Sequence, residues 1–373
     1  MRAVARRPLF GATSPTCLGS KDPGASRPAG AIVAVDEGIP MPKPVVPDAV
    51  LADAVHLACR APSFHNSQPW RFVLRDRGVL HLYVDRDRLV ETDRSGRQAL
   101  LSCGAVLDHL RVATAAAGWI ADVEYYPNPN DPTHLASIEF RPMSYVTRAH
   151  RRRATAILAR CTDRLPFAAP ADWERFEPLL RHAVDDDLAV LDILPDEARP
   201  QLAQASSLTE SLRLYDSSYH AELDWWTGPF ATSDGIPHSS LVSAAESDRV
   251  DVGRAFPVTH HRQRRTDVPE DRSKVLVLSA LGDTRRDMLT CGEALSVTLL
   301  EATMAGLATC PLTHLTEVPA TREVVSSLTG HPLPQVLIRV GMVPAIDDFP
   351  PRTPRRPLSE VLTWAPSSAA VPR

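Results

Sequence analysis

Two segments of the sequence align with each other without a gap, and this repeat limits the possible folds more than any other feature. Residues 103–119, CGAVLDHLRVATAAAGW, and residues 291–307, CGEALSVTLLEATMAGL, share Cys, Gly, Leu, Ala and a closing Gly at the same offsets. Both have apolar residues at helical spacing and end in a glycine suited to a helix C-cap, so both are predicted helices. Their small side chains allow close approach, so we expect the two helices to pack together at the centre of the molecule.

Runs of strand-like residues flank both predicted helices. They lie at residues 79–85, 120–126 and 135–140 around the first helix, and at residues 274–281 and 335–343 around the second. The repeated order of strand, helix and strand predicts two copies of one α+β unit, and 373 residues are enough for about two units. A chance match between two Ala-rich helices is the alternative.

Charge and cysteine usage narrow the classes of partner. The formal net charge is -4, so we expect a small-molecule partner, with no nucleic acid and no membrane. The six cysteines lie far apart without a CxxC pair or metal-ligand spacing, which favours a reducing cytoplasm and no metal site. Residues 1–47 are rich in Pro, Gly, Ala and Ser without periodicity, so they are interpreted as a disordered tail or as the result of a start codon set too early.

A short polar stretch bounded by prolines stands out at residues 59–72, CRAPSFHNSQPWRF. Pro62 and Pro69 fix the backbone, and the polar residues between them can cap a helix or contact a ligand. Trp70 is expected to begin a strand and to be buried. An ordinary surface loop is the alternative.

Three further segments lie between the two copies. Residues 145–167 predict a basic helix that ends in a turn carrying Arg160, Thr162 and Arg164. Residues 222–241, ELDWWTGPFATSDGIPHSSL, have no periodicity and are interpreted as a long loop or lid, although the Trp pair could equally fill the core. Residues 259–267, THHRQRRTD, are interpreted as a solvated basic loop. No GxGxxG, Walker-type, HExxH or GxSxG motif is present.

Four stretches taken together resemble a known family: APSFHNSQPW, RCTDRLPF, GEALSVTLLEATMAGLATCPLTH and TPRRPL. They resemble the nitroreductase superfamily of FMN-dependent flavoproteins, and most closely its Acg-type branch, in which two nitroreductase-like halves are fused in one chain. The resemblance extends from about residue 48 to the C-terminus. It implies an α+β nitroreductase fold, with residues 48–145 and 146–373 as two halves of a pseudo-dimer and a lid segment near residues 222–241.

The resemblance also implies a single FMN site. Ordinary nitroreductases are homodimers in which each FMN lies between an arginine-containing turn of one subunit and a PS-x-x-N-x-QPW loop of the other. Here the first half keeps only the loop and the second half keeps only the turn. One FMN site is therefore expected at the seam between the halves, and a homodimer is not required to form it.

The family's pattern assigns the site residues by position. Arg160, with Arg355 or Arg356, is expected to bind the FMN phosphate, because forked guanidinium groups match phosphate oxygens. The other assignments are a phosphate contact for the Thr162 hydroxyl, backbone amides of Thr313 and His314 facing flavin N5, Arg164 near the N1/O2 edge, and hydrogen bonds from Ser63 and Asn66. The full predicted set is Pro62, Ser63, Phe64, His65, Asn66, Gln68, Arg160, Thr162, Arg164, Thr313, His314, Arg339, Arg355 and Arg356.

Each assignment has a plainer alternative. Asn66 could merely cap a turn, and Arg355 and Arg356 could be a solvated pair. His314 stands where the family usually has an acidic residue and a glycine, so only its backbone donor is carried over.

The function that the resemblance implies is FMN-dependent, NAD(P)H-linked reduction of nitroaromatic or quinone-like acceptors. No catalytic side chain is assigned, because the flavin carries the chemistry. A flavin-binding or flavin-sequestering protein with little turnover is the alternative, and a regulatory protein that binds a partner is a third possibility.

Overall fold

The structure is a computed structural model that describes residues 44–75, 78–228, 233–344 and 352–365. The predicted tail at residues 1–47 therefore falls almost entirely outside the described residues. The structure describes its last four residues, and one of them, Val46, is buried in the hydrophobic core together with residues of the following helix.

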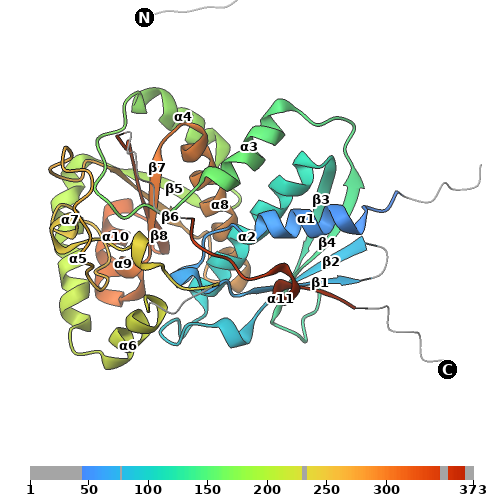
Figure 1. The fold of residues 1–373 in the computed structure, drawn as a ribbon, viewed down its shortest axis with the longest axis horizontal. Helices are drawn as coiled ribbons and strands as arrows, with labels where there is room; N and C mark the ends of the chain where they lie inside the picture. Colours follow the sequence, from blue (N-terminus) through green and yellow to red (C-terminus); the bar gives the residue numbers. More distant parts are fainter. Residues whose placement is uncertain (1–43, 76–77, 229–232, 345–351, 366–373) are drawn as a thin grey trace, which may run out of the picture. The chain divides into compact units, whose positions relative to one another are not determined.

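The first of two sheets is built mainly from the first half of the chain (Figure 1). Its strand order is β3-β4-β2-β1-β9, and all neighbouring strands are antiparallel except β1 and β9. The strands are β1 (Trp70–Arg75), β2 (Val79–Val84), β3 (Trp119–Tyr125), β4 (His134–Pro142) and β9 (Leu362–Trp364).

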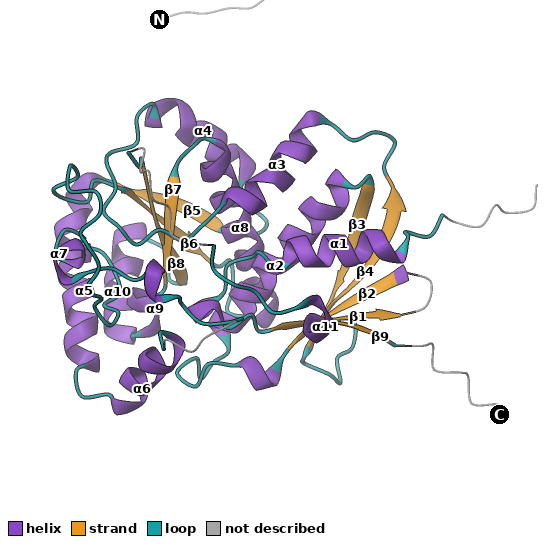
Figure 2. Cartoon of the chain, in the orientation of Figure 1, coloured by secondary structure: helices purple, strands orange, loops and turns teal. Residues whose placement is uncertain are grey.

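The second sheet has the order β5-β6-β8-β7, and all its neighbours are antiparallel (Figure 2). Its strands are β5 (Val190–Leu194), β6 (Lys274–Ser279), β7 (Ala308–Leu312) and β8 (Pro334–Gly341). When β1 to β4 are matched with β5 to β8, the two sheets have the same strand order. This shared topology confirms the predicted pair of similar sheet-plus-helix halves, with β9 as an added strand on the first sheet.

Helices fill the space between and around the sheets. They are α1 (Asp48–Ala58), α2 (Arg97–Ala116), α3 (Arg148–Ala159), α4 (Trp173–Ala183), α5 (Arg199–Arg213), α6 (Ser217–Trp226), α7 (Ala244–Ser247), α8 (Arg285–Met304), α9 (His314–Glu317), α10 (Pro319–Thr329) and α11 (Leu358–Val361). The two repeated segments lie in α2 and α8, as predicted. The basic helix predicted from residue 145 corresponds to α3, which ends just before Arg160.

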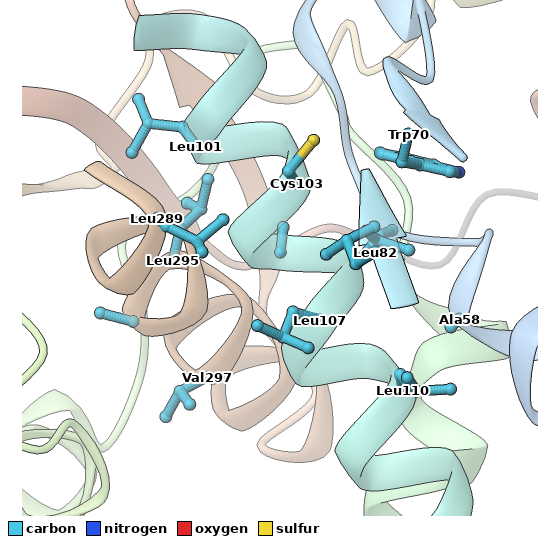
Figure 3. Packing of buried hydrophobic residues seen from close by; sticks show 14 of the residues in the cluster. Ala58, Trp70, Leu82, Leu101, Cys103, Leu107, Leu110, Leu289, Leu295 and Val297 are labelled. Atoms are coloured by element: carbon cyan, nitrogen blue, oxygen red, sulfur yellow. The ribbon is translucent and has the colours of Figure 1, made fainter. Parts of the chain in front are cut away.

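The central contact of the fold is between α2 and α8. Figure 3 shows Leu101 and Leu107 of α2 beside Leu289 and Leu295 of α8 in the shared core. In the described part of the chain, one helix, α2, is long and apolar enough to cross a membrane. Most of α2 is nevertheless buried inside the protein. Its apolar length is therefore explained by its position between α1, α3, α8 and the first sheet.

The chain returns to the first sheet near its end. β9 pairs in parallel with β1, with Phe72 opposite Leu362, and α11 packs beside the same strand. Residues 352–364 thus lie with the first sheet, although the predicted second half, residues 146–373, included them. This return brings the TPRRPL stretch next to the loop that precedes β1.

Candidate functional site

The Pro-bounded loop between α1 and β1 has an unusual backbone. His65, Asn66 and Gln68 have φ angles of 51°, 58° and 51°, in the left-handed region that non-glycine residues seldom adopt. Each such residue costs on the order of 1–3 kcal/mol and persists only where the surroundings hold it. Here the Ser63 hydroxyl accepts a hydrogen bond from the Gln68 amide at 3.0 Å, and the Ser102 hydroxyl accepts one from Phe64 at 3.1 Å.

Two polar side chains of this loop bind backbone groups from distant segments. Asn66 Nδ2 donates to the carbonyls of Gly235 at 3.0 Å and Pro354 at 3.2 Å. Gln68 Nε2 donates to the Ser233 carbonyl at 2.9 Å, while its Oε1 accepts from the Arg356 amide at 2.9 Å. The described hydrogen bonds of these side-chain amides therefore join three segments of the chain.

His65 is buried in the same loop and contacts α6. Its Nε2 lies 3.3 Å from Glu222 Oε1, and Glu222 also accepts hydrogen bonds from the Thr92 amide and hydroxyl at 3.0 and 2.8 Å. Burial lowers the pKa of His65, against the opposing effect of Glu222, so the imidazole is neutral at neutral pH. The contact fixes the position of α6 against the loop.

Three arginines converge where the loop, the end of α3 and the TPRRPL stretch meet. Arg160 is only 6% exposed; its Nη2 donates to the Arg60 carbonyl at 3.3 Å, while its Nε and Nη1 have no partner among the described residues. Arg355 Nε donates to the Cys59 carbonyl at 2.8 Å, and Arg60 Nη1 donates to the Thr353 carbonyl at 3.0 Å. Within the described ranges, no carboxylate forms an ion pair with any of the three.

The uncompensated charge of this arginine cluster, Arg60, Arg160 and Arg355, changes its proton affinity. Burial, together with repulsion from Arg60, lowers the pKa of Arg160 to about 10. Burial and the two neighbouring guanidinium groups lower the pKa of Arg355 well below its usual range. Buried cations without a counter-charge are strongly disfavoured, so the cluster is suited to binding an anion.

A cavity of about 670 Å³ opens beside the arginine cluster, between elements of both halves. Most of the predicted site residues line it: Pro62, Ser63, Phe64, His65, Asn66, Arg160, Thr162, Arg164, Thr313, Arg339 and Arg355. Three of the predicted residues, Gln68, His314 and Arg356, are not among its lining residues. The two family elements that sequence analysis placed at one seam therefore do meet at one cavity.

The three residues outside the lining have structural contacts instead. Arg356 is buried, with Nη1 3.3 Å from Asp85 Oδ2 and 3.3 Å from the Gln68 carbonyl, so its assignment as a phosphate ligand is not supported by its position. His314 is 1% exposed and contacts the Ser206 hydroxyl through Nε2 at 2.7 Å. Burial lowers the pKa of His314 to about 3, so its imidazole stays neutral.

Two lining arginines differ in how far they are already engaged. Arg339 forms an ion pair with Asp271 at 3.0 Å and donates to the Arg164 carbonyl at 3.2 Å, so it supports the turn after α3. Arg164 lies with its guanidinium carbon 4.9 Å from the ring centre of Phe256, and burial lowers its pKa. Arg164 thus remains available to a ligand edge in a way that Arg339 does not.

The predicted lid segment is partly helical, which corrects the interpretation of residues 222–241 as a loop. Residues 222–226 belong to α6, whose N-terminus is capped by the Asp216 side chain. Trp225 is 78% exposed, and neither it nor Trp226 lines the cavity, so the pair neither fills the core nor covers the site. Residues 229–232 lie outside the described residues, and Ile236, further along, does line the cavity.

The basic stretch at residues 259–267 is the expected solvated loop only in part: residues 260–263 are exposed, but Arg264 and Arg265 are not. Arg264 binds Glu246 at 3.0 Å and several backbone carbonyls, while Arg265 is buried and forms an ion pair with Asp163. Arg265 also donates to the Pro166 carbonyl at 3.2 Å, so this stretch braces the turn that carries Arg164.

The cavity is also lined by three residues that were not predicted from the sequence: Arg60, Arg254 and Phe256. Arg60 immediately follows the Cys59 that opens the polar stretch, so its place next to that loop was a usable signal. Arg254 and Phe256 lie in an irregular segment without a motif, and no local pattern identifies them. Among the described residues, no group of three or more His, Cys, Asp or Glu side chains could hold a metal ion.

No family model matches the chain. It is similar to a protein of Mycobacterium tuberculosis named acg and described provisionally as an NAD(P)H nitroreductase, with 61% identity over 86% of this chain and 97% of that protein. An uncharacterized protein of the same organism is 55% identical over 84% of this chain and 92% of its own length. A further provisional NAD(P)H nitroreductase of that organism is 34% identical over 85% and 92%.

Solved structures give weaker likenesses. The FMN-dependent nitroreductase NfnB from Mycobacterium smegmatis, in complex with NADPH, covers 58% of this chain and 99% of its own at 18% identity and a TM-score of 0.36. The FMN and NADPH-dependent nitroreductase NfnB from sphigopyxis sp. strain HMH covers 57% and 98% at 15% identity and a TM-score of 0.35.

Proposed function

The chain belongs to the nitroreductase superfamily, and from that membership we propose that it is a flavin-dependent NAD(P)H oxidoreductase holding one FMN between its two halves. The observation that carries the proposal is the arginine cluster at the cavity. Arg160 is buried there, and its Nε and Nη1 have no partner in the described part of the chain. A phosphate group would accept these hydrogen bonds and offset most of the positive charge of the cluster.

The residues of the cavity fit the remaining parts of FMN. Phe256 provides aromatic surface for a planar ring, and Arg164 lies over Phe256 where it can face a ring edge that becomes negative on reduction. Thr162 and the arginine cluster would hold the phosphate, with Arg355 fixing the backbone of residues 59–61 through its own hydrogen bonds. Asn66 would act mainly by positioning the loop.

When bound, FMN would supply hydride transfer from NAD(P)H to an acceptor of the nitroaromatic or quinone-like class. The chain's own residues would bind and orient the two reactants, and water could supply protons. Both elements of the site come from one chain, so a homodimer is not required. The five cysteines that the structure describes are free thiols, which supports a reducing, cytoplasmic setting.

A flavin-sequestering role is the second candidate, and one observation favours it. The carbonyls of Ser233 and Gly235 are tied to the Gln68 and Asn66 side chains, so the segment that carries Ile236 is fastened across the loop. A cover fastened in this way would slow the exchange of both flavin and substrate.

The visible spectrum of the purified full chain distinguishes these roles. We expect a yellow protein with one FMN per chain that bleaches on anaerobic addition of NADPH. A yellow protein that stays oxidised favours sequestration, and a colourless protein that does not take up added FMN contradicts both. A stoichiometry near two would contradict the single site at the seam.

A further inference from the structure

Arg254 stands at the cavity wall in the segment between α7 and β6. Its guanidinium carbon lies 5.3 Å from the ring centre of Phe64, so the segment brings a cation against the Pro-bounded loop. Phe256, two residues later, lies edge-on to the His65 ring at 6.2 Å. One cation and two aromatic rings from different segments therefore share one part of the cavity.

The charge of Arg254 is only partly compensated. Glu317 of α9 forms an ion pair with Arg254 and a second one with Arg213 at 2.9 Å. Because two guanidinium groups share one carboxylate, one positive charge remains uncompensated. Burial keeps His65 and His314 neutral, so neither imidazole adds to that charge or removes it.

Other carboxylates do not cancel this surplus. Glu222 keeps its charge, but its partners among the described residues are His65 and Thr92 rather than Arg254, and it does not line the cavity. The acidic side chains that line the same cavity are Asp163, Glu210, Asp248 and Asp251. The last three are exposed, Asp163 forms an ion pair with Arg265, and Asp251 pairs with Arg199 at 2.8 Å. Water and salt screen exposed charges strongly, whereas the Arg254 side chain is only 5% exposed.

The hydrogen bonds of Arg254 leave donors for a ligand. Nη1 donates to the Tyr219 hydroxyl at 3.3 Å. Nη2 donates to the Thr313 hydroxyl at 3.3 Å and to the Glu317 carboxylate. No partner for Nε is recorded in the described part of the chain. Thr313 is also the residue whose backbone amide is assigned to flavin N5, so Arg254 adjoins the place where the acceptor must lie.

We propose that Arg254 is a specificity-determining residue that favours aromatic acceptors carrying an anionic group, such as a carboxylate. This inference rests on the proposed function, because it needs an acceptor next to a bound flavin. The Phe64 ring, which lies against Arg254, contacts the aromatic part of the acceptor, and the free donor capacity of Arg254 binds the carboxylate.

Ligand titrations of the FMN-loaded full chain test this without requiring turnover. The probes are 4-nitrobenzoate and its neutral counterpart 4-nitrobenzyl alcohol, and binding is followed by the change in flavin absorbance. The variants are Arg254→Met, which removes the charge, and Arg254→Lys, which keeps it. Arg148→Met, an exposed position on α3 away from the cavity, is the matched control.

We expect the wild type and Arg148→Met to bind the carboxylate about 10-fold to 100-fold more tightly than the alcohol, the range of a charge-assisted hydrogen bond. Arg254→Met should lose this preference and leave the affinity for the alcohol unchanged, and Arg254→Lys should keep part of it. Equal affinities in the wild type, or a full preference in Arg254→Met, would overturn the inference.

A second variant decides the matter if Arg254→Met does not fold. Glu317→Gln removes the counter-charge, so the preference for the carboxylate should increase, and an unchanged or smaller preference overturns the inference. Binding of FMN distinguishes a failure of the proposed function from a failure of this inference alone. A wild-type chain that does not bind FMN overturns the proposed function and this inference with it, whereas a yellow protein without the preference overturns this inference alone.

Discussion

Gly104 and Gly292 face each other where α2 crosses α8: a methyl group added to Gly104 would lie 2.8 Å from the Cα of Gly292 and would overlap the Leu289 carbonyl. A methyl group on Gly292 would in turn overlap the Leu101 carbonyl. Leu101 and Leu289 each stand three residues before their glycine, so the two contacts are mirror copies of one contact. The repeat in the sequence is therefore also a repeat in the packing.

Gly104→Ala should destabilise the protein by roughly 2–4 kcal/mol, because backbone atoms of another helix cannot move aside as a flexible side chain could. Gly292→Ala should do the same. Urea unfolding measures the loss, and Ala115→Ser, on a half-buried position near the end of α2, is the control with a change within about 1 kcal/mol. Unfolding midpoints that match the wild type would show that the helices are not in this contact.

Arg160→Ala and Arg356→Ala should have different effects, although both arginines belong to motifs of the family. Arg160→Ala should weaken FMN binding by about 1.5–3 kcal/mol, because it removes donors from the phosphate. Arg356→Ala should mainly lower the melting temperature, because Arg356 joins Asp85 and the Gln68 carbonyl to the end of the chain. Fluorescence titration with FMN and thermal unfolding separate the two effects. Equal losses of FMN affinity in the two folded variants would contradict the assignment.

Glu293 gives the fold a dependence on pH. It is fully buried beside Arg111, accepts a hydrogen bond from the Tyr125 hydroxyl at 2.7 Å, and burial raises its pKa to about 7. In the unfolded chain it ionises near its ordinary pKa of 4.5, so the folded state binds the extra proton between these values. The contribution of Glu293 to stability is therefore fully present below about pH 4.5 and is lost as the pH rises towards 7.

Glu293→Gln should remove this dependence. As the pH rises from about 4.5 to 7, the free energy of unfolding of the wild type should fall by about 1–3 kcal/mol relative to that of the variant. The free energy of unfolding, measured in urea from pH 4.5 to 8, gives the difference. Parallel curves for the two proteins would show that Glu293 does not titrate in this range.

Asn66→Asp should loosen the cover of the cavity. Aspartate tolerates the left-handed backbone of this position, but it has no N–H to donate to the carbonyls of Gly235 and Pro354. Release of FMN on dilution should become about 10-fold faster, as expected for the loss of one or two hydrogen bonds. Trp225→Ala, at an exposed position off the cavity, should leave the release rate unchanged. A stable Asn66→Asp protein with the wild-type release rate would argue against a fastened cover.

The sequence predicted those features that depend on local periodicity or on the repeat. The helices α2 and α8 and their flanking strands follow from apolar spacing, and their pairing follows from small residues at matched positions. The loop and the turn could be assigned to one seam because each half keeps only one of the two family elements.

Errors arose where the partner of a side chain is distant in sequence. Arg355 and Arg356 are adjacent, but Arg355 lines the cavity and Arg356 contacts Asp85, which no local pattern reveals. Arg265 was expected in solvent because its neighbours are polar, yet Asp163, 102 positions earlier, neutralises it in the interior. The exposed Trp225 shows the opposite error, since a large aromatic residue on a helix need not face the core.

The pairing of β9 with β1 has a consequence for the order in which the protein is made. The loop at residues 62–68 and the strand β1 leave the ribosome early. Arg355 and β9, which pairs with the edge of β1, are synthesised much later, since Arg355 lies 296 positions after Cys59. Until then the first sheet has an open edge and the strained loop lacks its support from Pro354 and Arg356. The anion site is therefore completed only after residues 352–364 have been synthesised, so a nascent chain would not hold the proposed cofactor before that point.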